Sequence, residues 1–408
     1  MNLRPFLVAA TVAATTLVSC GADGNDAGYT NGDCTSDGPI QRLIDQAEPG
    51  DTVQIPAGHY TESVVINKND LTIVGSPNPA DTTFDGCKKL PVGMLVTGDH
   101  VSVRGFTFSH FSVTGLFFNG VAISGDTTPI DGFEAQGIVA YNNGLYGIYA
   151  FEATNGTIAN TYTSGHPDSG IYVGQCSACN VIVQDSIAER NAVGFEGVNS
   201  SDVWIVNSVF RNNRIGITPS TQSTERNAPQ QASVIAGNLV IDNNQPADTP
   251  EQAAGGWGLG IAIGGGNQNL IVNNRVTGHD NVGIAITSMT TFDPTGNTVT
   301  GNTVTGNTID LGWWLRGGQT PTDGNCFRDN TFDTSTPADI ETVLADSCAG
   351  QLNIIAAPVY TITPGGAGSN WRDIPTPTVP AINWDADTAP QFGVPAGTTA
   401  DSYKVPAL

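Results

Sequence analysis

A two-residue motif, glycine followed by a large apolar residue, recurs along the middle of the chain. It stands at Gly147-Ile148, Gly170-Ile171, Gly194-Phe195, Gly216-Ile217, Gly260-Ile261 and Gly283-Ile284, at spacings of 23, 24, 22, 44 and 23 residues. A constant spacing of this size is typical of repeat proteins in which each unit stacks on the next. The spacing of 44 indicates one coil with two insertions, near residues 219–229 and 245–256; two separate coils are the alternative.

Each period contains three short apolar runs, and the third run ends in asparagine. These asparagines are Asn142-Asn143, Asn191, Asn212-Asn213, Asn243-Asn244 and, more weakly, Asn281. Three strands in about 23 residues predict a right-handed, single-stranded parallel β-helix of the pectin lyase type, since a propeller blade needs roughly twice that period. Asparagine suits tight turns with left-handed backbone, and stacked coils would let the amides form ladders.

A solenoid must cover its ends, because a terminal coil exposes apolar core and unpaired backbone. Ile40, Leu43, Ile44 and Ala47 have helical spacing, with Asp37 as a candidate cap, and predict an N-terminal helical cap. Residues 338–345 predict a second small cap at the other end. Residues 351–408 are rich in proline and lack the repeat, which predicts an extended C-terminal arm along the solenoid; a flexible tail is the alternative.

The first twenty residues indicate export. Arg4 precedes an apolar stretch, residues 6–17, that is too short to span a bilayer. Leu17-Val18-Ser19-Cys20 resembles the lipobox of bacterial lipoproteins, which implies that Cys20 carries lipid and anchors the chain in the cell membrane, facing outside the cytoplasm. An ordinary signal peptide cut nearby is the alternative. The predicted division is a signal peptide at 1–19, a tether at 20–36, the β-helix with its cap helix at 37–350 and the arm at 351–408.

Six further cysteines predict disulfides, because an even number in an exported chain is typical of an oxidising compartment. Fifteen pairings are possible for six cysteines. Chain order favours Cys34 with Cys87, Cys176 with Cys179 and Cys326 with Cys348. A zinc site at Cys176 and Cys179 would need two more ligands at matching spacing, and none is nearby in the sequence.

The charge of the chain argues against some partners. It has 15 basic and 38 acidic residues, a formal net charge of −23, and loss of residues 1–19 would remove one arginine and leave −24. Nucleic acid is therefore excluded as a partner. Polyanionic sugars are disfavoured too, unless calcium or a local group of arginines intervenes.

The N-terminal cap, Gly147-Ile148-Tyr149, the segment Asp168 to Gln175 and the asparagine-turned coils resemble a family of exported parallel β-helix repeat proteins, many of them lipoproteins. The resemblance covers roughly residues 38–350. That family has no assigned activity, so the resemblance implies a fold and a compartment but no catalytic residue. The architecture is also similar to that of pectate lyases, polygalacturonases and mannuronan C5-epimerases, whose Asp-Asp, Gly-His-Gly and Asp-Pro-His-Glu motifs are missing here.

Alternation along each strand predicts an exposed column of side chains, because the residue after each inward apolar residue points outward. In chain order this column is Tyr149, Tyr172, Glu196, Thr218, Ala262 and Ala285. Glu152, His166 and Asp168 lie at the ends of the same early strands. Tyrosine rings beside carboxylates are a plausible platform for a polysaccharide, with Tyr149 and Glu152 as substrate-binding residues. The alternative interpretation is that these side chains only stabilise neighbouring coils.

Three kinds of chemistry fit this column. A hydrolase would use two of the carboxyl groups as acid and base, for example Asp168 with Glu196. A lyase or epimerase would use His166 or Tyr172 as the base, and calcium on Asp168 and Glu196 to neutralise the substrate carboxylate. The competing classes are a non-catalytic surface lipoprotein that binds a protein partner and a structural or metal-loaded stalk. Whether the chain is an enzyme stays open at this stage.

Overall fold

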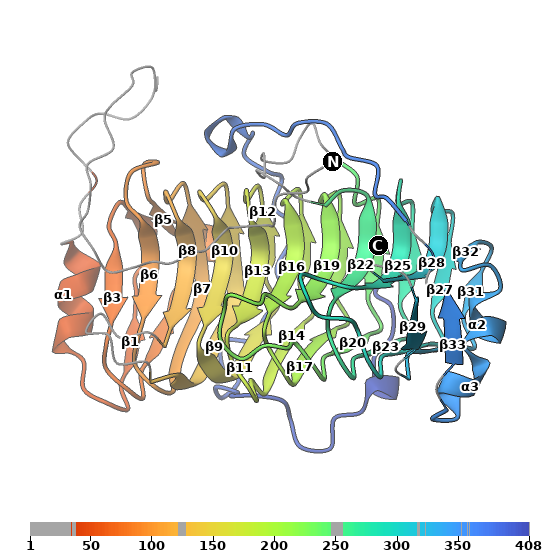
Figure 1. Cartoon of the computed structure of the whole chain (residues 1–408). Helices are drawn as coiled ribbons and strands as arrows, with labels where there is room; N and C mark the ends of the chain where they lie inside the picture. The colour runs from red at the N-terminus through yellow and green to blue at the C-terminus, as the bar shows by residue number, and fades with distance from the viewer. Residues whose placement is uncertain are drawn as a thin grey trace.

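The computed structural model describes residues 34, 38–120, 128–245, 256–315, 319–322, 324–351, 353–356, 358 and 360–407. The chain winds as a right-handed parallel β-helix, a single elongated stack of short strands with small helices at both ends (Figure 1). Each coil contributes one strand to each of three faces, as the repeat predicts.

Face 1 forms a sheet of its own, in which each strand pairs in parallel with the strand of the next coil. Its strands are β3 (Val64–Ile66), β6 (Val92–Val96), β8 (Thr114–Asn119), β10 (Tyr146–Phe151), β13 (Ser169–Gly174), β16 (Val193–Val198), β19 (Ile215–Ser220), β22 (Leu259–Gly264), β25 (Val282–Thr287), β28 (Ile309–Trp314) and β32 (Ser335–Thr336).

Faces 2 and 3 are joined, because two long strands run across both of them. These are β7 (Val101–Ser109) and β9 (Ile130–Tyr141), which have left-handed glycines at Gly105 and Gly137. Face 2 otherwise holds β1 (Thr52–Gln54), β4 (Thr72–Val74), β11 (Ala153–Ala159), β14 (Val181–Gln184), β17 (Val203–Val206), β20 (Val234–Ala236), β23 (Leu270–Val272), β26 (Thr298–Thr300) and β30 (Cys326–Arg328). Face 3 holds β2 (Gly58–Tyr60), β5 (Thr82–Asp85), β12 (Tyr162–Ser164), β15 (Ile187–Glu189), β18 (Val209–Arg211), β21 (Leu239–Ile241), β24 (Arg275–Thr277), β27 (Thr303–Thr305) and β31 (Thr331–Phe332).

The register of face 1 confirms the predicted inward column. Ile148 pairs with Ile171, Ile171 with Phe195 and Phe195 with Ile217, and all four belong to the main core. β19 pairs directly with β22, with Ile217 opposite Ile261. The 44-residue spacing is therefore one coil with insertions. Of these, residues 221–233 are described, whereas 246–255 lie outside the described residues.

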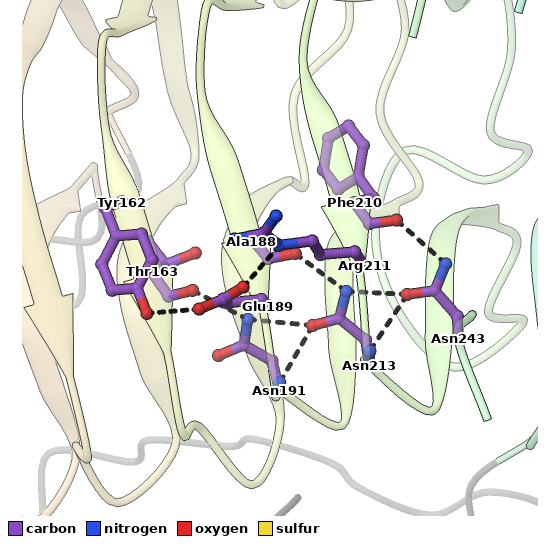
Figure 2. Close-up of polar contacts among 9 residues, drawn as sticks. All are labelled: Tyr162, Thr163, Ala188, Glu189, Asn191, Phe210, Arg211, Asn213 and Asn243. Carbon is purple, nitrogen blue, oxygen red and sulfur yellow. Dashed lines mark hydrogen bonds and ion pairs between the residues drawn. The ribbon is translucent and has the colours of Figure 1, made fainter. Parts of the chain in front are cut away.

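The corners of the coils use a two-residue turn that explains the asparagines. The first residue has left-handed backbone, as at Asn212 (φ 54°), and the second, here Asn213, turns its side chain into the stack. Asn191 Nδ2 donates to Asn213 Oδ1 at 3.1 Å, and Asn213 Nδ2 donates to Asn243 Oδ1 at 2.9 Å (Figure 2). The amides also bond backbone carbonyls, such as that of Ala188. The predicted ladder is confirmed, and it satisfies polar groups that burial would otherwise leave unpaired.

The N-terminal cap is helix α1 (Pro39–Gln46), which buries Ile40 and Ile44. Leu43, placed by its spacing on the same face, is instead 37% exposed. The N-cap position belongs to Gly38, which makes no side-chain cap; Asp37, the predicted cap, lies outside the described residues. Glu62 takes over that role, because its carboxylate accepts hydrogen bonds from the Ile40 and Gln41 backbone N–H groups at 3.1 and 3.3 Å.

The other end of the stack is closed by helices α2 (Ile340–Val343) and α3 (Ala345–Cys348), which place Ile340 and Leu344 in the core. A two-stranded antiparallel ribbon, β29 (Gln319–Thr322) with β33 (Asn353–Ala356), lies beside them. Disulfides join Cys34 to Cys87, Cys176 to Cys179 and Cys326 to Cys348, the pairing that chain order favours. No helix among the described residues has the length and apolar character to cross a membrane.

Residues 360–407 run back along the outside of the stack, with short 3-10 turns at η2 (Trp371–Asp373) and η3 (Ala400–Ser402); a third, η1 (Pro79–Asp81), lies in the stack itself. Ile374 O accepts from Asn142 Nδ2 at 2.9 Å, and Trp384 Nε1 donates to Pro77 O at 2.8 Å. The segment then turns toward the C-terminal coils, where Val394 N donates to Asn180 Oδ1 at 3.2 Å. The described part of the arm is thus extended along the solenoid (Figure 1).

Candidate functional site

Three tyrosines form an aromatic cluster on the outer side of face 1. Tyr146 and Tyr149, both on β10, stack with ring centroids 4.2 Å apart and an interplanar angle of 6°. Tyr172 on β13 lies 4.7 Å from Tyr149 and 5.5 Å from Tyr146. Tyr149, Tyr172 and Glu196 occupy successive positions of one column, as predicted. Their strand neighbours Ile148 and Ile171 face the core, so the tyrosines point the other way.

The column is not exposed, which corrects the expectation from the sequence. Tyr149 is 6% and Tyr172 5% exposed. The insertion after β19 accounts for part of this cover. Glu225 accepts a hydrogen bond from Gln175 Nε2, and Asn227 Nδ2 donates to the Gln175 carbonyl at 2.8 Å. Strand alternation predicted the direction of these side chains correctly, but it carries no information about a loop that folds back over them.

A pair of carboxyl groups borders the tyrosine cluster. Asp168 and Glu196 both contact the Ser169 hydroxyl, whose Oγ lies 3.0 Å from Asp168 Oδ1 and 2.7 Å from Glu196 Oε2. Tyr146 is also close enough to Asp168 to lower the pKa of its carboxyl group. The structure therefore brings together Asp168, Glu196, Tyr149 and Tyr172, four of the residues that the sequence singled out.

The surroundings of the pair disfavour the ionised form of both carboxyl groups. Burial raises the pKa of both groups, and the neighbouring Asp168 carboxylate raises the pKa of Glu196 well above its ordinary value. The shift is the stronger one for Glu196, so its surroundings favour the neutral acid more than those of Asp168 do. A neutral acid beside a carboxylate is the arrangement required for general acid–base chemistry.

The tyrosine hydroxyl groups are neutral as well. Burial raises the pKa of Tyr146, Tyr149 and Tyr172 well above 10, and the surrounding carboxylates raise it further. Such a hydroxyl can donate or accept a hydrogen bond, but it is a poor base. The structure therefore gives no support to Tyr172 as the group that removes a proton from a substrate.

His166 is part of the polar ladder inside the stack and not of the carboxyl pair. Its Nε2 lies 3.2 Å from Asn143 Nδ2, and its Nδ1 lies 2.7 Å from Asn191 Oδ1. Because the residue is fully buried, its pKa is lowered to about 4. Both ring nitrogens are thus engaged in the ladder. The sequence did contain a signal for this role, because Gly165-His166 stands where the next coil has the turn pair Arg190-Asn191.

Glu152 lies at the end of β10 and is 4% exposed. Its Oε1 pairs with Arg226 Nη1 at 3.0 Å, and its Oε2 has no hydrogen-bond partner among the described residues. Arg226 comes from the same insertion as Glu225. The predicted substrate-binding residue Glu152 therefore helps to hold the cover over the aromatic cluster.

Three members of the cluster were missed by the sequence reasoning. Tyr146 and Ser169 each stand one position before the glycine of the repeat motif, and that position could have been followed through the coils as Val193 and Ile215. These residues lie on the outer side, since Val193 and Ile215 form a cluster separate from the main core. Glu225 had no signal, because an irregular insertion has no period.

The described residues contain no group of three or more histidine, cysteine or acidic side chains arranged to hold a metal ion. Asp168 and Glu196 form a pair of carboxyl groups, and His166 and His279 are engaged in the ladder.

Two protein families match parts of the chain. The family described as "Right handed beta helix region" matches residues 92–247, and the family described as "Periplasmic copper-binding protein (NosD)" matches residues 229–358. No curated protein matches the chain. The described residues do not offer the ligand group that a copper site of their own would need.

The solved structures of similar fold include two epimerase modules. The A-module of mannuronan C-5 epimerase AlgE4 from Azotobacter vinelandii is 18% identical with a TM-score of 0.55, covering 73% of this chain and 91% of its own. The AlgE6 A-module from the same organism is 15% identical with a TM-score of 0.53, covering 72% and 93%. The chain thus folds as a right-handed parallel β-helix, similar in fold to these two modules. Its three disulfides are typical of proteins outside the cytoplasm.

Proposed function

We propose that the protein recognises an extracellular polysaccharide at the aromatic and carboxyl cluster of face 1. The observation that carries the proposal is that three packed tyrosine rings border a pair of carboxyl groups, since Tyr172 lies opposite Glu196 and the Ser169 hydroxyl joins Glu196 to Asp168. Aromatic faces bind the apolar faces of sugar rings, and neighbouring polar groups hold the hydroxyls. The solved structures of similar fold are named as epimerases of a polysaccharide, which supports the same class of ligand.

The geometry favours binding over hydrolysis. Glycosidases hold their two carboxyl groups about 5–9.5 Å apart, on either side of the scissile bond. Asp168 and Glu196 instead contact the same Ser169 hydroxyl, at 3.0 and 2.7 Å, so a hydroxyl of the chain itself bridges the two groups. Hydrolysis would require the pair to separate, whereas recognition can use the pair as it stands.

A glycan array with the full exported chain tests the proposal, with binding constants measured for each positive glycan. We expect Tyr149→Ala and Glu196→Gln to weaken binding about tenfold or more, since one stacking contact is worth on the order of 1 kcal/mol and a lost buried hydrogen bond a similar amount. Asp131→Asn, an exposed acid on face 2, is the matched control. An array without a positive glycan would count against the proposal.

The same preparations can be assayed for turnover, with and without calcium, by the ultraviolet absorbance of unsaturated uronate and by reducing ends. Calcium on Asp168 and Glu196 is part of the proposal only as the cation that a lyase or epimerase reaction would need. Turnover that depends on calcium and is lost in Glu196→Gln would extend the proposal from binding to catalysis.

A second candidate is a non-catalytic surface protein that binds a protein partner. The burial of Tyr149 and Tyr172 favours it, because covered rings can serve simply to hold neighbouring coils together. Co-purification of one partner from the membrane fraction, unaffected by Tyr149→Ala, would support this alternative against the first.

We also propose that the chain is held at the outer surface of the cell membrane by lipid on Cys20. Cys20 lies outside the described residues, so the proposal depends on the sequence Leu17-Val18-Ser19-Cys20. We expect Cys20→Ser to move the protein from the membrane fraction to the soluble exported fraction, because the diacyl chains of the mature protein would be lost. Mass spectrometry of the wild-type N-terminal peptide provides the direct check; a peptide without acyl chains would contradict the proposal.

A further inference from the structure

Four carboxyl groups lie near the three tyrosines. Glu196 is opposite Tyr172 in the register of face 1, and the Ser169 hydroxyl joins it to Asp168. Glu152 directly follows β10, and Glu225 is bonded to Gln175, which directly follows β13. After burial, these four groups also raise the pKa of Tyr149. Asp168, Glu196 and Glu225 have the same effect on Tyr172. Acids therefore reach the cluster from β13, β16, the end of β10 and the insertion after β19.

Arg226, which the insertion after β19 brings to this cluster, already forms an ion pair with Glu152. Arg226 Nη1 lies 3.0 Å from Glu152 Oε1, and the Arg226 carbonyl accepts from Asn199 Nδ2 at 2.8 Å. Glu225 on the adjacent position is fixed by Gln175. Arg226 and Glu225 together add no net positive charge to the cluster, and Glu152 keeps a second carboxylate oxygen, Oε2, that is unpartnered among the described residues and buried.

These groups are better suited to bind the hydroxyl groups of a ligand than its carboxylates. The carboxyl oxygens of Asp168, Glu196 and Glu152 can accept hydrogen bonds from sugar O–H groups, and the tyrosine hydroxyls can also donate to sugar oxygens. A uronate carboxylate offers acceptors only, and it would lie among several negative charges in a chain of formal charge −23.

We infer that the ligand of this site is a neutral polysaccharide, and that uronate polymers are rejected by the acids around the tyrosine cluster. This inference rests on the proposed function and adds the chemical class of the sugar. It separates the chain from the mannuronan epimerases of similar fold, because those are named for a polymer of uronate units.

Matched pairs of oligosaccharides test the inference. Each pair consists of a neutral oligomer and its C6-oxidised counterpart of the same length and linkage, titrated into the full exported chain by calorimetry at neutral pH. We expect the neutral member of the binding pair to bind at least about tenfold more tightly at low salt. This difference in affinity should become smaller at high salt, since screening weakens the repulsion between partly exposed charges.

Glu225→Gln should reduce the ratio of affinities for the neutral and the oxidised oligomer several-fold. The substitution removes one negative charge and keeps an oxygen that can accept from Gln175. Glu48→Gln, an exposed acid beside the N-terminal cap, is the matched control and should leave the ratio of affinities unchanged. Equal or tighter binding of the uronate member, with or without added calcium, would overturn the inference and leave the proposed function standing. If no member of any pair binds, the proposed function fails and the inference fails with it.

Discussion

Two histidines occupy ladder positions that asparagine holds in neighbouring coils. His166 follows Gly165 and His279 follows Gly278, and in both cases the glycine has the left-handed backbone of the turn. His279 Nδ1 lies 2.8 Å from Asn307 Oδ1 and its Nε2 lies 3.1 Å from Asn243 Nδ2. A neutral imidazole has one donor and one acceptor and can therefore replace a ladder amide. A protonated ring has two donors and cannot accept from the preceding asparagine.

The histidines should make stability depend on pH. Burial lowers the pKa of His166 and of His279 from 6.5 to about 4. Between these values the unfolded chain binds protons that the folded chain does not, so the free energy of unfolding falls as pH decreases from 6.5 to 4, and neither histidine lowers it further below that. Each histidine contributes on the order of 3 kcal/mol to this loss. Urea unfolding across this range measures it.

The variant His166→Asn/His279→Asn separates this effect from the titration of carboxyl groups. Asparagine does not titrate, so the variant should gain stability relative to the wild type as pH falls through the same window. Parallel pH profiles for the two proteins would contradict the ladder role of the histidines.

At the scale of the element, the asparagine ladder stabilises the corners of the coils. Asn213 accepts from the backbone N–H and the side chain of Asn191, and donates to the Ala188 carbonyl and to Asn243. We expect Asn213→Ala to lower the free energy of unfolding by about 1–3 kcal/mol or more, because several buried groups lose their partner at once. Urea unfolding measures the change.

Gln184→Ala is the control for that variant, since Gln184 ends β14 and its half-buried side chain lies outside the ladder. Its cost should stay below about 1 kcal/mol. Equal costs for the two substitutions would show that the ladder adds nothing beyond ordinary side-chain packing.

At the scale of the molecule, the arm binds to a buried ion pair that belongs to the stack. Arg104 Nη2 lies 2.6 Å from Glu134 Oε2, with side chains 2% and 1% exposed. The arm completes their bonds, because Arg104 Nη1 donates to the Thr388 carbonyl and Gln391 N donates to Glu134 Oε1 at 2.9 Å. Trp384 packs where Gly105 and Gly137 lack side chains. The arm therefore binds the stack at a specific site.

Removing this site should release the arm. We expect Trp384→Ala to make limited proteolysis within residues 371–407 at least several-fold faster, because local opening exposes extended backbone to the protease. Trp371→Ala is the control, since the Trp371 ring contacts Arg372 of the arm itself. If both variants are cut as slowly as the wild type, the arm is held elsewhere.

Much of the architecture could be predicted from the sequence, because each coil repeats the same local pattern. Gly170-Ile171 and its counterparts indicated the strands of face 1, and Asn191 and Asn213 indicated the turns. Tyr149, Tyr172 and Glu196 could be placed in one column for the same reason. The prediction that Leu43 lies on the buried side of the cap helix was wrong. The short helix α1 at the end of the stack buries a narrower side than the spacing of its apolar residues suggests.

The candidate site was predictable only in part. Alternation along a strand determines direction, so the sequence by itself determined the coil, its register and the residues that lie side by side. It could not determine what covers them, because the Glu225 insertion and the Trp384 arm have no period and contact residues far away in the chain. Only the tertiary structure decided that the tyrosines are buried, that Asp168 and Glu196 meet at the Ser169 hydroxyl and that His166 belongs to the ladder. Local patterns follow from backbone geometry, whereas burial and pKa depend on long-range packing.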